Sequence, residues 1–208
     1  IMPLATPKGI TIPFPERLAE GYEVIARNSG GYHLRVNIDG TRLEDVFRDL
    51  VALVPDPGFL ILESPCNEVK ELELRTTESD PFHRDIYFID DLERYQFENI
   101  FNQYSELLIH DGFVHFGFGS HNTKQKDEVF VGFYKITSVF TDDPLPYEAV
   151  LGEFAIPRVS KLTTAWDTFS EENPGVRDRW KQGENDIYSM IESLMREGGL
   201  YHAKTIND

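Results

Sequence analysis

The 208-residue sequence contains a single cysteine, no long hydrophobic run and comparatively few basic residues. Because Cys66 has no second cysteine to pair with, an internal disulfide is impossible, and a reducing compartment such as the cytoplasm is expected. No apolar stretch approaches the roughly 18 to 20 residues that a helix needs to cross a bilayer. The N-terminal residues lack a basic stretch followed by an apolar run, so no signal peptide is expected. These absences predict a protein that does not associate with membranes.

The short motifs that mark common enzyme classes are missing as well. The chain has no G-x-S-x-G, no P-loop and no C-x-x-C sequence. The stretch GFGSHN has Asn122 where a dinucleotide-binding loop would need its third glycine, and no helix is expected to open after it. We therefore assign no catalytic residue, metal ligand or cofactor, and we favour a binding protein over an enzyme.

What the sequence has in excess is negative charge. There are 36 Asp and Glu residues against 20 Lys and Arg, which gives a net charge of −16. Such a surface repels nucleic acids and anionic membranes at long range, so neither is expected as a partner. Residues 63–111 alone hold 13 acidic and four basic residues. Clusters of this kind occur on solvated surfaces and also on faces that dock basic proteins.

From this cluster we predict an acidic protein-binding module that docks a basic partner. One version is an immunity-type inhibitor that covers the cationic substrate cleft of a nuclease-like toxin, since opposed charges speed such encounters. In size and charge, the chain with its DGFVHFGFG and EVFVGFYKI segments resembles small acidic bacterial proteins that neutralise toxins. The oligomeric state is left open. The predicted contact residues are Glu68, Glu71, Glu73, Asp90, Asp91 and Glu93.

Hydrophobic periodicity predicts an α+β fold with a mixed or antiparallel sheet and helices mainly on one face. A hairpin is expected around NSGG, and apolar residues spaced by three and four from Leu43 to Val54 predict an amphipathic helix. Further strands are expected at FLILES, ELELR, DIYFID, FVHFGFGS, EVFVGFYKITSVF and KLTTAWDTF, and further helices at DLERYQFENIFNQYSELLIH, LPYEAVLGEFAI and DIYSMIESLMREGG.

These elements predict a single domain over residues 1–208, with an extended N-terminal arm at residues 1–16 and a C-terminal helix at residues 184–198. Four prolines and the lack of periodicity make the arm irregular. Between residues 85 and 168 the predicted order is β-α-β-β-α-β, which fits a split βαβ unit.

The stretch FVHFGFGSHNTKQKDEVFVGF is the densest cluster of suggestive residues in the chain. Alternation places Phe116 and Phe118 on one face of the first strand and His115 on the other, and the second strand is apolar on both faces. Such strands are typically buried on two sides. We therefore predict a long hairpin with the polar tip SHNTKQKD, and not an aromatic face that binds RNA.

Four residues with metal-binding chemistry lie within twelve positions: His110, Asp111, His115 and His121. Histidine and aspartate suit zinc or iron, so a hydrolase or metal-dependent enzyme that uses these four residues is the first alternative function. No two of them have the i, i+4 spacing of H-E-x-x-H. A single histidine in a strand is also commonly a hydrogen-bonded core residue.

A second alternative is a small-ligand site near TAWDTFSEENPG. Trp166 and Asp167 offer an aromatic wall and a carboxylate, which suit the rim of a pocket. The interpretation that we favour is Trp166 as a core anchor and Asp167 as a cap or turn former.

Overall fold

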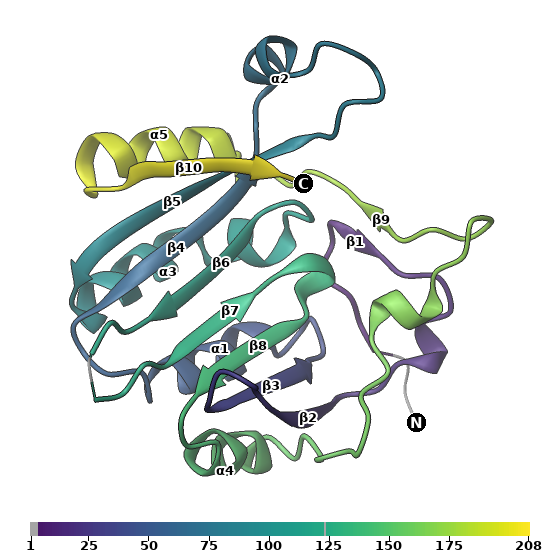
Figure 1. The fold of residues 1–208 in the computed structure, drawn as a ribbon, viewed down its shortest axis with the longest axis vertical. Helices are drawn as coiled ribbons and strands as arrows, with labels where there is room; N and C mark the ends of the chain where they lie inside the picture. Colours follow the sequence, from purple (N-terminus) through teal and green to yellow (C-terminus); the bar gives the residue numbers. More distant parts are fainter. Residues whose placement is uncertain (1–3, 123) are drawn as a thin grey trace.

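The computed structural model describes residues 4–122 and 124–208, in which an eight-stranded antiparallel sheet is the central element (Figure 1). A small second sheet pairs β1 (Ile10–Thr11) with β9 (Val176–Arg177). The α+β class predicted from the sequence is confirmed. The strands of the large sheet, in spatial order, are β10 (Tyr201–Asn207), β5 (His83–Leu92), β4 (Gly58–Pro65), β6 (His115–Gly119), β7 (Glu128–Val131), β8 (Thr137–Thr141), β3 (Tyr32–Asn37) and β2 (Gly21–Ala26).

A layer of helices covers one face of the sheet. It is made of α1 (Leu43–Val51), α3 (Arg94–His110), α4 (Leu145–Glu153) and α5 (Ile187–Glu197). Helices α1 and α3 lie behind the sheet in the view of Figure 1. The layer is continuous because α1 contacts α4 and α3, and α3 also contacts α5. Strand residues that face it, such as Phe116 and Val129, are fully buried. In the described ranges, no helix is both long and apolar enough to cross a membrane. The remaining helix, α2 (Glu68–Leu74), lies apart from this layer.

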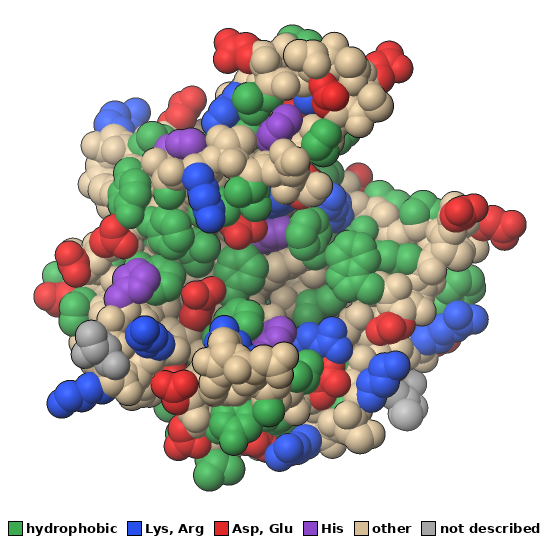
Figure 2. Space-filling model, viewed as in Figure 1, with side chains coloured by type: hydrophobic (Ala, Val, Ile, Leu, Met, Phe, Trp, Pro, Cys, Tyr) green, Lys and Arg blue, Asp and Glu red, His purple; other side chains and the backbone are tan. Residues whose placement is uncertain are grey.

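The opposite face of the sheet has no helix layer. Its side chains include Phe130, Ser138 and Phe140, which are only half-buried. Figure 2 views this face and shows hydrophobic side chains across its middle, interspersed with charged ones. The prediction that the central strands are buried on two sides is confirmed for β6, in which every residue is buried. It is wrong for β7 and β8, because the segments that cross this face cover only part of it.

The segment EVFVGFYKITSVF, predicted as one strand, forms β7 and β8 with a tight turn between them. The turn contains the 3₁₀ helix η2 (Phe133–Lys135) and is closed by a hydrogen bond from Gly132 N to Ile136 O of 3.1 Å. Tyr134 and Lys135 both have left-handed backbone conformations, with φ of 53° and 57°. Non-glycine residues rarely adopt this conformation, so residue types alone did not signal the turn.

Two other predicted strands are also absent. ELELR belongs to α2, whose N-cap Asn67 accepts a hydrogen bond from Lys70 N. KLTTAWDTF contains the 3₁₀ helix η3 (Ala165–Thr168), which begins with a capping box between Thr164 and Asp167. In both places a side-chain cap outweighs the strand propensity of the neighbouring residues. The N-terminal arm, predicted as extended, includes β1 and the 3₁₀ helix η1 (Pro15–Arg17).

Three segments that are distant in the sequence meet at a junction made of backbone hydrogen bonds. Gly9 N donates to His110 O, Gly112 N donates to Asp178 O, and Asp178 N donates to Gly9 O, at 2.8 to 2.9 Å. A methyl group at Gly112 would overlap the carbonyl oxygen of Gly9 and the backbone of Asp178. The junction ties the N-terminal arm, the end of α3 and the β9 segment together.

We expect Gly112→Ala to lower the free energy of unfolding by about 1 to 3 kcal/mol, because the added carbon overpacks this junction. Gly152→Ala is the matched control, since Gly152 lies in α4 with open space around it. This control should raise the free energy of unfolding by about 0.5 to 1 kcal/mol through helix propensity. Urea unfolding of both variants measures the two effects. A Gly112→Ala variant as stable as the parent would contradict the tight junction.

Candidate functional site

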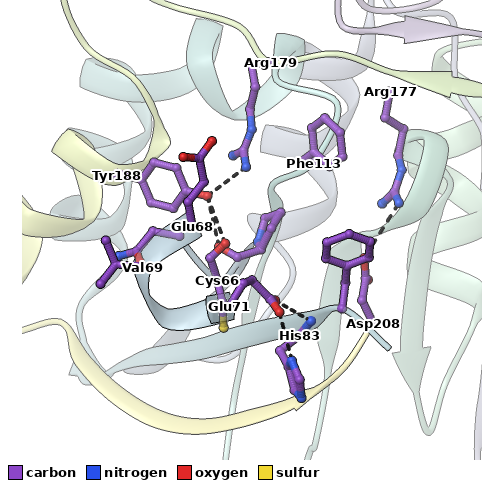
Figure 3. Close-up of a pocket in the computed structure, with 13 residues that line it drawn as sticks. Cys66, Glu68, Val69, Glu71, His83, Phe113, Arg177, Arg179, Tyr188 and Asp208 are labelled. Carbon is purple, nitrogen blue, oxygen red and sulfur yellow. Dashed lines mark hydrogen bonds and ion pairs between the residues drawn. The ribbon is translucent and has the colours of Figure 1, made fainter. Parts of the chain in front are cut away.

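A cleft of about 730 Å³ lies between α2 and the segment that carries β9 (Figure 3). One wall comes from residues 66–82, which link β4 to β5 and which we call the α2 excursion. The other wall, which we call the arginine wall, comes from Arg177, Arg179, Phe113 and Tyr188 of α5. Figure 2 shows the α2 excursion projecting from the body of the protein with a notch beside it. The size lies within the range of small-molecule sites in proteins, about 300 to 1,000 Å³.

The α2 excursion is ordered by its own side chains although α2 has no buried residue. Arg75 donates to the carbonyls of Asp80 and Glu78, at 2.9 and 2.7 Å, and its guanidinium lies 4.0 Å from the ring centroid of Phe82. The carboxylate of Asp80 accepts hydrogen bonds from Thr76 and Thr77, and these bonds hold the pKa of Asp80 well below its usual value. The excursion therefore keeps its shape without packing on the core.

Two polar contacts anchor the base of the excursion to β5. The Glu71 carboxylate accepts hydrogen bonds from His83 N at 2.6 Å and lies 3.1 Å from His83 Nδ1. Lys70 Nζ donates to Asp85 at 2.5 Å. Asp85 also accepts a hydrogen bond from Thr205 on β10, so α2 is joined to the edge of the sheet. These hydrogen bonds lower the pKa of Asp85 and outweigh the opposing effect of burial.

On the opposite wall two arginines flank one aromatic ring. The guanidinium carbons of Arg177 and Arg179 lie 4.9 and 4.8 Å from the ring centroid of Phe113. Arg179 Nη2 donates to the Tyr188 hydroxyl at 2.7 Å, and that hydroxyl donates to Pro65 O at 3.3 Å. This chain of contacts orients Arg179 and ties the arginine wall to the end of β4.

The single cysteine also borders the cleft. Burial, together with the nearby Asp85 carboxylate, raises the pKa of the Cys66 thiol to about 12. The thiol is therefore protonated at neutral pH, and a protonated thiol is a poor nucleophile. Cys66 therefore lines the cleft as a buried, neutral thiol.

Behind the cleft, a buried polar network joins β4, β5 and β6. Arg84 Nη2 donates to the carbonyls of Phe113 and Glu63, at 2.7 and 3.2 Å, and Arg84 Nη1 lies 3.5 Å from the Asp208 carboxylate. Glu63 lies 3.0 Å from His115 Nδ1. Burial raises the pKa of Glu63 and lowers the pKa of His115 well below its usual value, so His115 is neutral. The network holds β4, β5 and β6 together next to the cleft.

Comparisons of the chain with protein-family models, curated proteins and solved structures gave no match. A function has to be inferred from the chain's own residues. Sequence reasoning had missed the arginine wall, since Arg177 and Arg179 lie in a stretch that reads as a polar loop. Their spacing of two residues in an acidic chain was the available signal, because extended backbone places such a pair on one side.

The structure does not bring the four potential metal ligands together. His110 Nδ1 accepts a hydrogen bond from Lys8 N, and both carboxylate oxygens of Asp111 accept hydrogen bonds from backbone N–H groups. His115 is paired with Glu63, and His121 stacks on Phe59 at the other end of β6. In residues 4–122 and 124–208, no group of three or more His, Cys, Asp or Glu side chains could hold a metal ion. The metal-enzyme hypothesis therefore gains no site from the fold.

The six predicted contact carboxylates form two groups at opposite ends of β5. Glu68, Glu71 and Glu73 lie on α2, near the start of β5. Asp90 and Asp91 lie near its end, roughly 23 Å away at about 3.3 Å per strand residue. Three of the six have contacts within the chain: Glu71 with His83, Asp90 with the Tyr201 hydroxyl, and Glu93 as the N-cap of α3. The other three, Glu68, Glu73 and Asp91, are exposed, and the two on α2 lie beside exposed apolar residues.

Trp166 and Asp167 lie outside the cleft. Trp166 is 54% exposed and packs edge-to-face against Phe133, Tyr134 and Phe169. The Asp167 carboxylate accepts hydrogen bonds from the backbone N–H and the hydroxyl of Thr164, so its geometry is that of a cap. The predicted pairing of this tryptophan with a free carboxylate at a pocket rim gains no support from these contacts.

Proposed function

We propose that the protein is a binding module that docks a basic protein partner through the outer surface of the α2 excursion. The observation that carries the proposal is that Leu72 and Leu74 on α2 are 82% and 40% exposed, on a helix that buries no residue. Soluble proteins rarely hold large apolar side chains on a projecting helix unless a partner covers them. The rigid excursion presents them without a change in fold.

Charge supports a basic partner over an acidic one. The excursion carries Glu68, Glu71, Glu73, Glu78 and Asp80 against Lys70 and Arg75. A partner with apolar residues surrounded by lysine and arginine would complement this surface, and opposed potentials speed its docking. An immunity-type inhibitor of a nuclease-like toxin meets this description, because a nuclease cleft is cationic. Such a protein would act in the cytoplasm, which also suits the single reduced cysteine.

The test is affinity capture from a lysate of the source organism with the full chain and two matched double variants. Leu72→Ser with Glu73→Lys alters the α2 surface, whereas Leu145→Ser with Glu153→Lys makes the same changes on the exposed face of α4. We expect the parent and the α4 variant to retain the same basic protein at low salt and to lose part of it at high salt. The α2 variant should retain much less. The retained fraction should have nuclease activity that added parent protein inhibits.

Equal retention by the two variants would mean that α2 is not the contact surface. If the retained protein has no nuclease activity, the proposed docking surface stands, but the toxin-neutralising function is rejected. Charge reversal at Asp90, Asp91 and Glu93 is a weaker test, because Asp91 has a left-handed backbone with φ of 51° and Glu93 caps α3. Changes at those positions would also affect folding.

A further inference from the structure

The inner side of the α2 excursion faces the arginine wall, and this side has chemistry that a basic protein partner would not use. Arg177 and Arg179 lie two residues apart, and both approach the ring of Phe113 (Figure 3). Two neighbouring guanidinium groups repel each other unless negative charge compensates them. In a chain with a net charge of −16, such a pair is a local exception.

Carboxylates of the chain itself compensate this pair only in part. In the described part of the chain Arg179 forms no ion pair, and its recorded hydrogen bond goes to the neutral Tyr188 hydroxyl. Arg177 Nη2 lies 3.8 Å from Asp208, which is a loose ion pair. Arg177 Nη1 is buried and has no hydrogen-bond partner among the described residues. Several oriented N–H donors are thus left for oxygen atoms that are not part of this chain.

The rest of the cleft combines aromatic rings with polar side chains. Of the two carboxylates deeper in the lining, Glu71 is hydrogen-bonded to His83, and Asp208 lies near Arg84 and Arg177. Phe82 and Val69 come from the α2 side, and Phe113 and Tyr188 come from the other side. Phe82 is 59% exposed, so it offers an open face for stacking. A ligand ring between these walls would replace water on both of its faces. The carboxylates of Glu68, Glu71 and Asp208 would repel a second acidic group on the ligand, which disfavours ligands with several acidic groups.

We propose that the cleft binds a small aromatic oxyanion, meaning a ring that carries one carboxylate or one phosphate group. The anionic oxygens accept hydrogen bonds from the guanidinium groups of Arg177 and Arg179. The ring lies against Phe82 and Val69. The planar guanidinium group matches both carboxylate and phosphate oxygens in a two-bond geometry, so the shared chemistry is an oxyanion on an aromatic body.

The test is isothermal titration of the full-length protein with four probes: benzoate, phenyl phosphate, benzyl alcohol and inorganic phosphate. We expect saturable one-to-one binding of benzoate or of phenyl phosphate, and the better of the two identifies the acidic group. Benzyl alcohol lacks the charge and inorganic phosphate lacks the ring, so each should bind at least about tenfold more weakly. Equal binding of inorganic phosphate and phenyl phosphate would overturn the aromatic part of the proposal.

Three variants locate the site. Arg179→Gln should weaken the better probe by at least about tenfold, as expected for the loss of a charge-assisted hydrogen bond. Phe82→Ser should weaken phenyl phosphate and leave inorganic phosphate unchanged. Arg196→Gln is the matched control, because Arg196 is exposed on α5 and away from the cleft lining. Full binding by Arg179→Gln, or no saturable binding of benzoate and phenyl phosphate at millimolar concentrations, would overturn the proposal.

Discussion

Replacing Arg84 by methionine should lower the free energy of unfolding by about 3 to 5 kcal/mol, the usual cost of removing one partner from a buried charge pair. The Arg84 side chain is only 2% exposed. It lies 3.8 Å from the Glu63 carboxylate and 3.5 Å from that of Asp208, and it also donates to two backbone carbonyls. Methionine fills a similar volume but leaves both carboxylates and both carbonyls without this donor.

Urea unfolding followed by tryptophan fluorescence measures the effect. Arg196→Met is the matched control, because its ion pair with Glu197 is on the surface, where such pairs contribute little. Adding Glu63→Gln to Arg84→Met should recover part of the loss, since one of the uncompensated charges is then gone. An Arg84→Met protein as stable as the control would mean that the network is not held together by this guanidinium.

The second large effect concerns pH. Lys135 is fully buried, and its Nζ donates to Leu108 O and Val114 O, both at 2.8 Å. Burial lowers the pKa of Lys135 to about 7, with a further small contribution from Arg84, while Asp111 acts in the opposite direction. The neutral amine has two N–H groups, which match the two carbonyls. Between about pH 7 and the ordinary lysine pKa near 10.4, the unfolded chain binds a proton that the folded chain does not.

The free energy of unfolding should therefore rise with pH above about 7, by up to about 3 kcal/mol between pH 7 and pH 9.5. Below pH 7 both states are protonated, so this contribution to the slope disappears. Lys135→Met removes the titrating group and should remove the rise, whereas the exposed control Lys126→Met should keep it. Urea unfolding at a series of pH values measures this. If the free energy of unfolding depends on pH in the same way for the parent and for Lys135→Met, Lys135 does not titrate in this range.

The parts of the fold that depend on local periodicity could be predicted from the sequence. The apolar stripe of α1, which includes Val46, Phe47 and Leu50, is buried as its spacing of three and four predicts. The C-terminal helix is found as predicted, with Asp186 as its N-cap. In both helices, burial of one apolar stripe and local helix propensity favour the same structure, so both helices can be predicted from the sequence alone.

The cleft could not be predicted in the same way, because its walls come from positions far apart in the chain. Pro65 contacts Tyr188 across more than 120 positions, and no local pattern records that distance. The turn at Tyr134 and Lys135 was not predicted for another reason. Its left-handed backbone is held by tertiary contacts, with Lys135 bonded to the end of α3 and Tyr134 packed on Phe169. The residue types there match a strand as well as they match this turn.

Another segment could replace the α2 excursion without a change in the sheet. β4 and β5 are paired up to Pro65 and Arg84, so residues 66–82 connect two strands whose ends already lie side by side. A short reverse turn could join the same ends without disturbing the sheet. Loop length also has only a weak effect on the entropy of closing such a connection. The docking surface that we propose on this segment is therefore separable from the folding of the sheet, and a different recognition segment could be grafted onto the same scaffold.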